Sequence, residues 1–172
     1  MTRKGKQYQY DPEVFKEKNE EHEFPKGAKG ILVCTICGAL YFKKSWNHQI
    51  SIEGEKEEAV LIRKTMCPAC RMIENKEFEG ELIVSNIPKK HFDEVVKIIE
   101  DTGVKAYQRD TQHRLIGIQT DNNSLRATTT ENQLAVEMSR KIKDAFKGKV
   151  EEKISYSPDP SDAVYIKIVF SD

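Results

Sequence analysis

The chain has 172 residues, of which 38% are hydrophobic and 33% charged, and its 28 Lys and Arg residues balance 28 Asp and Glu residues. This length suits one medium domain, or a small metal-binding module joined to an ordinary domain. The zero formal charge excludes a global basic field, so any nucleic-acid binding would have to come from a local patch. No apolar run is long enough to span a membrane, and the basic start of the chain lacks the apolar segment of a secretory signal. We therefore expect a cytoplasmic protein with reduced cysteines and no membrane partner.

Residues 1–29 are predicted to form a charged N-terminal arm. Its first residues carry three cations and two tyrosines, the side chains that track a phosphate backbone and stack on bases. A flexible, solvated terminus explains the same composition, and we favour that interpretation.

All the cysteines of the chain lie in two CxxC pairs. They are Cys34 and Cys37, then Cys67 and Cys70. Two residues between thiols let one backbone turn direct both sulfurs at a single ion, and four thiolates make the soft tetrahedral ligand set that zinc prefers. Residues 30–75 are thus predicted to be a four-cysteine zinc ribbon that holds one structural Zn²⁺ and has no open coordination position.

Cysteine pairs of this kind also have three other uses. A disulfide framework needs an oxidising compartment, to which nothing in the chain points. A redox CxxC motif needs only one pair and leaves the second unexplained. An iron site uses the same four thiolates and stays open as an alternative at this point.

The predicted ribbon carries candidate RNA contacts. Short apolar segments at residues 31–33 and 40–42 flank the first cysteine pair and are expected to form a hairpin. Lys43, Lys44 and Trp46 follow the hairpin, and Arg71 follows the second pair. These side chains suit phosphate pairing and base stacking. Packing of Trp46 against the metal site explains the tryptophan equally well.

Residues 76–172 alternate strand and helix patterns. Strands are expected at residues 81–84, 115–119, 125–129, 150–156 and 164–170. One helix is expected from Pro88 to a terminating Gly103, and a second from a capping box of Thr130 and Gln133 to a terminating Gly148. The order β-α-β-β-α-β-β predicts an α+β domain, a two-layer ferredoxin-like α/β sandwich, which by itself does not indicate a function. If the ribbon is an independent module, metal removal should unfold it and leave this domain folded.

The second helix has a basic face, and its cations are further candidate RNA contacts. They are Arg140, Lys141, Lys143 and Lys147. Cations near a helix C-terminus also complement the helix dipole, and a run of charge more often only keeps a surface solvated. The chain has no phosphate-binding loop and no His beside a nucleophile, so we expect no enzyme activity.

Two short motifs resemble a family. The segment Cys67-Pro68-Ala69-Cys70-Arg71 and the helix start Thr129-Thr130-Glu131-Asn132-Gln133-Leu134-Ala135 look like those of small prokaryotic proteins with a CxxC…CPxCxR zinc ribbon. The resemblance runs from about Cys34 to Phe170. That family is distantly similar to the zinc-binding part of the Nmd-type adaptors of the large ribosomal subunit, which have more cysteines and further domains.

The resemblance implies a partner, RNA or the ribosome, but no role in export. Our sequence hypothesis is therefore a zinc-ribbon protein that binds RNA or associates with the ribosome. A protein–protein interaction adaptor with a structural zinc site is the alternative, followed by an iron or redox protein.

Overall fold

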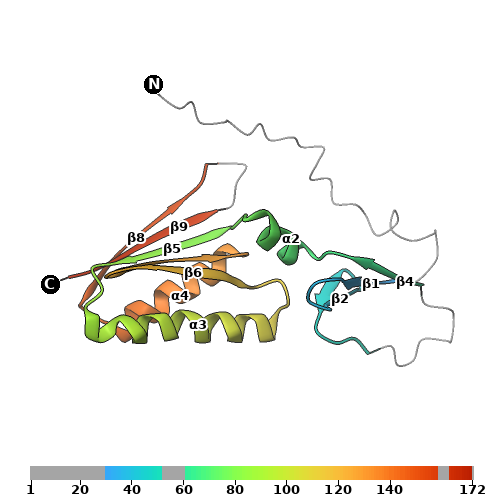
Figure 1. Cartoon of the computed structure of the whole chain (residues 1–172), viewed down its shortest axis with the longest axis horizontal. Coiled ribbons are helices and arrows are strands. Elements are labelled where there is room, and N and C mark those ends of the chain that lie inside the picture. The colour runs from blue at the N-terminus through green and yellow to red at the C-terminus, as the bar shows by residue number, and fades with distance from the viewer. Residues whose placement is uncertain (1–29, 52–60, 159–162, 172) are drawn as a thin grey trace, which may run out of the picture.

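The computed structural model describes residues 30–51, 61–158 and 163–171 (Figure 1). The predicted N-terminal arm, residues 1–29, lies outside the described residues. Within them, the elements form two sheets and three α-helices. None of these helices is both long enough and apolar enough to cross a membrane.

The first sheet lies next to the cysteine pairs, and Cys34 is the last residue of one of its strands. Its strands are β1 (Gly30–Cys34), β2 (Leu40–Phe42), β3 (Ser45–Asn47) and β4 (Leu61–Thr65), in the spatial order β3-β2-β1-β4. β1 and β2 are antiparallel, which confirms the predicted hairpin, whereas β4 runs parallel to β1. The helix α2 (Pro68–Asn75) follows β4. We call residues 30–51 and 61–75 the cysteine module.

The hairpin of β2 and β3 was not predicted. Lys43 and Lys44 form its two-residue turn, and both have left-handed backbone angles, with φ of 49° and 66°. Turns of this hand match the right-handed twist of the flanking strands, although Asn and Gly adopt them more readily than Lys. A turn signal was therefore missing from the sequence.

The second sheet and two helices form the predicted α+β sandwich. Its elements are β5 (Gly80–Ser85), the 3₁₀-helix η1 (Lys89–His91), α3 (Phe92–Arg109), β6 (Leu115–Asp121), β7 (Ser124–Thr129), α4 (Asn132–Ala145), β8 (Val150–Tyr156) and β9 (Val164–Phe170). This order confirms the expected β-α-β-β-α-β-β succession. We call residues 80–158 and 163–171 the sandwich. The boundary predicted between residues 75 and 76 falls between α2 and β5 and stays a prediction.

The sheet of the sandwich has the strand order β6-β7-β5-β9-β8. β9 is parallel to β5 and antiparallel to β8, so the last strand of the chain lies inside the sheet and the sheet is mixed. Its alternate residues explain this position, because Val164, Ile166, Ile168 and Phe170 are all buried. β8 exposes most of its residues and forms the edge.

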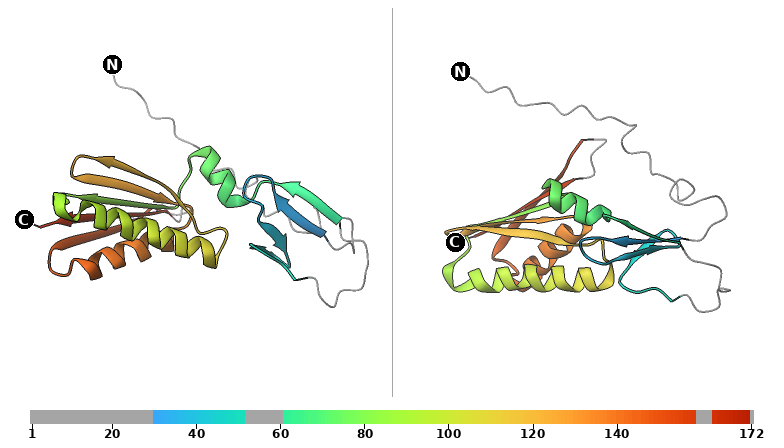
Figure 2. Two further views of the ribbon diagram at one scale, coloured as in Figure 1. Left: turned by 60° about the horizontal axis from the view of Figure 1, so that its bottom comes forward. Right: turned by 45° about the vertical axis from the view of Figure 1, so that its right-hand side comes forward.

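Both long helices cover the same face of this sheet (Figure 2). Val95 and Ile99 of α3 and Met138 of α4 are fully buried against Leu82 and Val84 of β5. Truncating one large side chain in such a core costs about 2–5 kcal/mol. The core of the sandwich therefore lies between the helices and one face of the sheet.

The predicted end of the first helix at Gly103 is wrong. α3 continues to Arg109, and Gly103 is buried in its interior. A Cβ atom at this position would lie 2.8 Å from the Cβ atom of Leu115 at the start of β6. The glycine is thus explained by the close approach of β6 to α3, which no local pattern reveals.

The predicted capping box at Thr130 is also wrong, by one residue. The cap of α4 is Glu131, whose carboxylate accepts a hydrogen bond of 3.0 Å from the N–H group of Leu134. The Thr130 hydroxyl instead donates to the carbonyl of Gln112 at 2.6 Å and accepts from the N–H group of Arg114 at 2.9 Å. Tertiary partners therefore take the threonine away from the helix terminus.

Candidate metal centre

The first cysteine pair lies on a tight turn between β1 and β2. The N–H group of Gly38 donates to the carbonyl of Cys34 at 3.0 Å, and the N–H group of Cys34 donates to the carbonyl of Ala39 at 2.8 Å. Gly38 has a φ of +75°, which glycine adopts without strain. The turn brings the sulfurs of Cys34 and Cys37 close to each other.

The second cysteine pair lies at the start of a helix and not in a second turn of this kind. Cys67 is the N-cap of α2, Pro68 is its first residue, and the N–H group of Cys70 donates to the sulfur of Cys67 at 3.5 Å. Proline at this position loses no helical hydrogen bond. The positive end of the helix dipole favours thiolates here.

The four sulfur atoms all lie within 4.8 Å of one another. The sulfurs of Cys37 and Cys67 are 3.8 Å apart, and tetrahedral ligands at a zinc–sulfur distance of about 2.3 Å would be separated by about 3.8 Å. Three of the cysteines are buried and Cys37 is half-buried. The four predicted ligands are thus brought together, and this group can hold a metal ion.

The protein environment shifts the pKa values of the cysteine thiols in different directions. Burial raises the pKa of Cys34, but hydrogen bonds from the backbone of Cys37, Cys67 and Ile36 outweigh it and lower the pKa to about 6. Burial raises the pKa values of Cys67 and Cys70 above their usual range. Because metal ligands must be thiolates, metal binding has to displace protons from this group.

A cation from the sandwich lies against the cysteines. Nη1 of Arg114 is 3.7 Å from the sulfur of Cys70, and Nε donates to the carbonyl of Thr111 at 2.8 Å. The guanidinium also covers the ring of Tyr107, with its central carbon 4.5 Å from the ring centroid. Arg114 is therefore held in place from both sides.

Nη2 of Arg114 is the one buried side-chain nitrogen or oxygen without a hydrogen-bond partner in the part of the chain that the structure describes. Metal-bound thiolates accept hydrogen bonds, and four of them around one divalent cation leave a net charge of about −2. A negatively charged metal–thiolate group would give this guanidinium nitrogen the hydrogen-bond acceptor that it lacks. Both the four sulfur ligands and the cation beside them are therefore suited to a bound metal ion.

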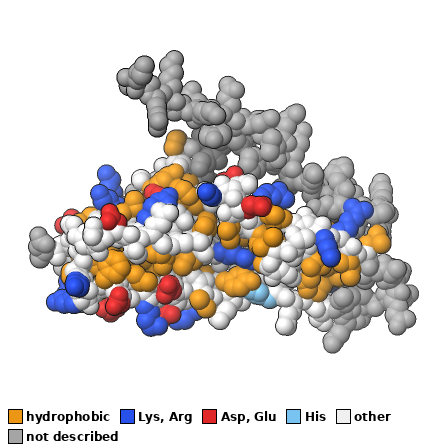
Figure 3. Space-filling view, in the orientation of Figure 1, with side chains coloured by type: hydrophobic (Ala, Val, Ile, Leu, Met, Phe, Trp, Pro, Cys, Tyr) orange, Lys and Arg blue, Asp and Glu red, His pale blue; other side chains and the backbone are white. Residues whose placement is uncertain are grey.

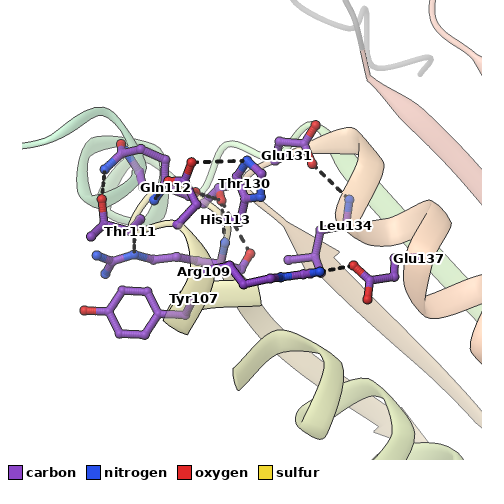
Figure 4. Close-up of polar contacts among 12 residues, drawn as sticks. Tyr107, Arg109, Thr111, Gln112, His113, Thr130, Glu131, Leu134 and Glu137 are labelled. Atoms are coloured by element: carbon purple, nitrogen blue, oxygen red, sulfur yellow. Dashed lines mark hydrogen bonds and ion pairs between the residues drawn. The ribbon is translucent and has the colours of Figure 1, made fainter. Parts of the chain in front are cut away.

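Two more contacts join the cysteine module to the sandwich. The side-chain oxygen of Gln112 accepts a hydrogen bond of 3.1 Å from the N–H group of Ala69 in the first turn of α2. The ring of His48 packs edge-on against Tyr107 and donates to the Tyr107 carbonyl. All three contacts come from residues 107–114, which we call the α3–β6 turn (Figure 4).

None of the residues of the α3–β6 turn that meet the cysteine module was predicted from the sequence. Arg114 is 44 residues from Cys70, and His48 is 59 residues from Tyr107. No spacing rule connects such positions. Only the folded chain brings them together.

The predicted RNA contacts of the cysteine module occupy different environments. Lys43, Lys44 and Arg71 are exposed. Trp46 is half-buried, packs against the cysteine cluster and lies 5.3 Å from the ring of Tyr41. Of the two interpretations of Trp46, packing beside the cysteines is the one that the structure shows.

The basic face of α4 is partly neutralised. Lys141 pairs with Glu137 at 2.8 Å, and Lys143 pairs with Glu152. Hydrogen bonding from Lys141 is the main reason that the pKa of Glu137 lies below its usual range. Arg140 and Lys147 are exposed, with no ion pair found for either among the described residues. Basic and acidic side chains are interspersed over the face seen in Figure 3.

A pocket of about 350 Å³ lies between the C-terminal end of α3 and the start of α4. In its lining, Arg109 lies 2.7 Å from Glu137 and His113 lies 3.9 Å from Asp110. None of its lining residues is a serine, threonine or cysteine.

The chain matches no protein-family model and no curated protein.

Proposed function

We propose that this protein is a zinc-ribbon protein that binds RNA or associates with the ribosome, and that it is not an enzyme. The observation that carries the proposal is the arrangement of the cysteine module, whose four sulfurs point at one another while Lys43, Lys44 and Arg71 face solvent. A closed thiolate site holds a shape and leaves no open position for chemistry. The module is then a scaffold for exposed cations that pair with phosphates.

The ion is one structural Zn²⁺ in this proposal. Sulfur ligands in a tetrahedral arrangement suit zinc and also suit iron. Elemental analysis of freshly purified protein distinguishes the two, because a single zinc per chain supports the proposal and stoichiometric iron, with visible colour, contradicts it. Reduced thiols also suit the cytoplasm, where we place the protein.

The family resemblance also supports the proposed partner. The CPxCxR segment that ends at Arg71 is similar to the ribbons of small prokaryotic proteins that resemble ribosomal-subunit adaptors. The partner we propose is therefore RNA or the ribosome, engaged by the cysteine module and by Arg140 and Lys147 of α4.

RNA binding is tested with the full, metal-loaded chain. Fluorescence anisotropy with labelled RNA, and co-sedimentation with ribosomes, should both show binding that weakens steeply as salt is raised. Lys43→Glu combined with Lys44→Glu should weaken it, whereas Lys105→Glu, an exposed control on α3, should not. Absent or salt-insensitive binding would contradict the proposal.

A second function, a protein-interaction adaptor, is favoured by one observation. β4 is an edge strand of the first sheet, and Ile62 and Leu61 on it are 68% and 39% exposed. Exposed strand edges pair with strands of partner proteins. In pull-downs from lysate, this function predicts nuclease-resistant partners that Ile62→Lys removes and that charge reversal at Lys141 and Lys143 leaves in place.

A further inference from the structure

Among the residues that the structure describes, the face of the sandwich sheet opposite α3 and α4 is open, and one row of side chains crosses all five strands on it. In the register of the sheet, Ile83 of β5 lies between Arg126 of β7 and Lys167 of β9. Arg126 in turn faces Gln119 of β6, and Lys167 faces Lys153 of β8. Neighbouring strands are about 4.8 Å apart, so the three cations span roughly 14 Å. We call these five residues the basic row.

The side of the sheet to which this row belongs follows from alternation along the strands. Ile166 and Ile168, which flank Lys167, are buried against the helices. Successive side chains on a strand point to opposite faces, so Lys167 and its cross-strand partners point away from the helices. Lys167 and Lys153 are both exposed.

An aromatic pair lies beside the basic row. Tyr165, two residues before Lys167 and on the same face, is 39% exposed and packs edge-on against Phe78, with ring centroids 6.2 Å apart. The guanidinium of Arg126 lies 5.2 Å from the centroid of the Phe78 ring. Because the core lies on the other face of the sheet, these rings are not needed to fill it.

Among the described residues, the open face carries three cations and three carboxylates, and what favours an anion is how they are arranged. Asp121 lies on the edge strand β6, at the opposite end of the face from the two lysines. Glu81 pairs with Arg126 at 2.6 Å. This ion pair neutralises the positive charge of Arg126 and holds its planar guanidinium over Phe78. Glu151 is exposed at the far edge of the face, opposite Val169. Lys167 and Lys153 then form adjacent positive charges next to an exposed ring.

From this juxtaposition we infer that the open face binds single-stranded RNA, with bases stacked on Tyr165 and Phe78 and phosphates paired with Lys167 and Lys153. Unpaired bases stack on aromatic side chains while cations follow the backbone. A duplex keeps its bases stacked inside and would meet only the cations. An acidic peptide would likewise use the lysines but not the rings.

The inference rests on the proposed RNA-binding function and names a second surface for it, away from the cysteine module. The two surfaces make separable predictions. Lys43 and Lys44 of the β2–β3 turn should contribute equally to the affinity for single-stranded and for duplex RNA, because they contact phosphates alone. The open face should discriminate between the two.

The test measures the affinity of the full, metal-loaded chain for a labelled RNA oligonucleotide and for the same sequence as a duplex. Tyr165→Ala should weaken single-strand binding by roughly 5- to 150-fold, the loss of one stacked base, with little effect on the duplex. Tyr165→Phe should retain affinity. Lys167→Glu should lower the salt dependence, by roughly 0.7 in log–log slope per lost phosphate contact.

Tyr156→Ala is the matched control. Tyr156 is 66% exposed on the neighbouring strand β8, but it pairs with the buried Val164 and so belongs to the opposite face. It should leave RNA affinity unchanged. Circular dichroism and metal content of each variant report whether it is folded.

The outcomes separate the two proposals. If the chain binds RNA, and the Tyr165 and Lys167 variants bind single strands as well as the wild type, the open-face inference is wrong and the ribbon proposal stands. Loss of nuclease-resistant protein partners in these variants, with RNA affinity unchanged, would overturn it in favour of a protein surface. A chain that binds no RNA overturns both.

Discussion

Arg114 and Cys70 meet in the folded protein, with Nη1 3.7 Å from the sulfur, although 44 residues separate them in the chain. The contact joins the sandwich to the candidate metal centre. A guanidinium that is stacked on Tyr107 and bonded to Thr111 cannot swing freely into solvent. A change in the charge of the cysteine cluster should therefore act, through Arg114, on how the cysteine module is held against the sandwich.

We expect Arg114→Met to weaken metal binding. The substitution removes the donor beside the thiolates and their charge partner while it keeps an unbranched side chain over Tyr107. Partners of metal ligands typically contribute 10- to 100-fold in affinity. Competition with a chromogenic chelator measures the change. Arg109→Met, which removes an exposed ion pair with Glu137 in the same region, is the control, and an equal effect of both variants would contradict a role for Arg114.

Metal removal should affect more than the cysteine module. If the ribbon is an independent module, chelation of the metal should unfold residues 30–75 and leave hydrogen exchange after residue 80 unchanged. The contacts of Gln112 with Ala69 and of Arg114 with Cys70 predict in addition that residues 107–114 lose protection. Hydrogen exchange before and after chelation checks this. Protection in β5 and β9, which lie in the core of the sandwich, should persist, and an unchanged α3–β6 turn would show that the modules are uncoupled.

Glu152 should make stability depend on acid pH. Its carboxylate accepts hydrogen bonds from the buried Ser139 and from Lys143, and so joins β8 to α4. Burial opposes ionisation, but these bonds outweigh it and lower the pKa of Glu152 below its usual value. A carboxyl group with a lowered folded-state pKa stabilises the fold above its unfolded pKa, and this contribution is lost as pH falls through the folded value.

Glu152→Gln should accordingly cost about 1 kcal/mol at neutral pH, a small value because Lys143 is half exposed to solvent. The difference from the wild type should shrink as pH falls from about 5 to about 3. Urea denaturation at several pH values measures it. A difference that is independent of pH would mean that the ionised carboxylate is not the stabilising group.

Gly103→Ala should destabilise the sandwich even though alanine favours helices by about 1 kcal/mol. The added methyl group would lie 2.8 Å from the Cβ atom of Leu115, an atom tied to the backbone of β6 that cannot rotate away. Overpacking of this kind costs about 1–3 kcal/mol, so the clash should outweigh the propensity. Gly117→Ala is the control, because nothing lies within 4 Å of its Cβ position. Equal stability of the two variants in urea denaturation would contradict the packing explanation.

Much of this protein follows from local pattern. The CxxC spacing predicts the cluster of four sulfurs, because two intervening residues suffice to aim both thiols of a pair at one ion. The alternation of Val164, Ile166, Ile168 and Phe170 predicts a strand with one buried face. Helices and strands of the sandwich were predicted in their correct order, since periods of 3.6 and 2 are properties of short segments.

Tertiary structure alone decided the rest. Gly103 has the local signature of a helix end, yet the approach of Leu115 accounts for it inside α3. Thr130 has the signature of a cap, yet partners across the fold take its hydroxyl. The insertion of β9 between β5 and β8, and the placement of Arg114 on the cysteines, depend on contacts between distant segments. Such contacts form only when separate elements pack, and for that reason no local pattern encodes them.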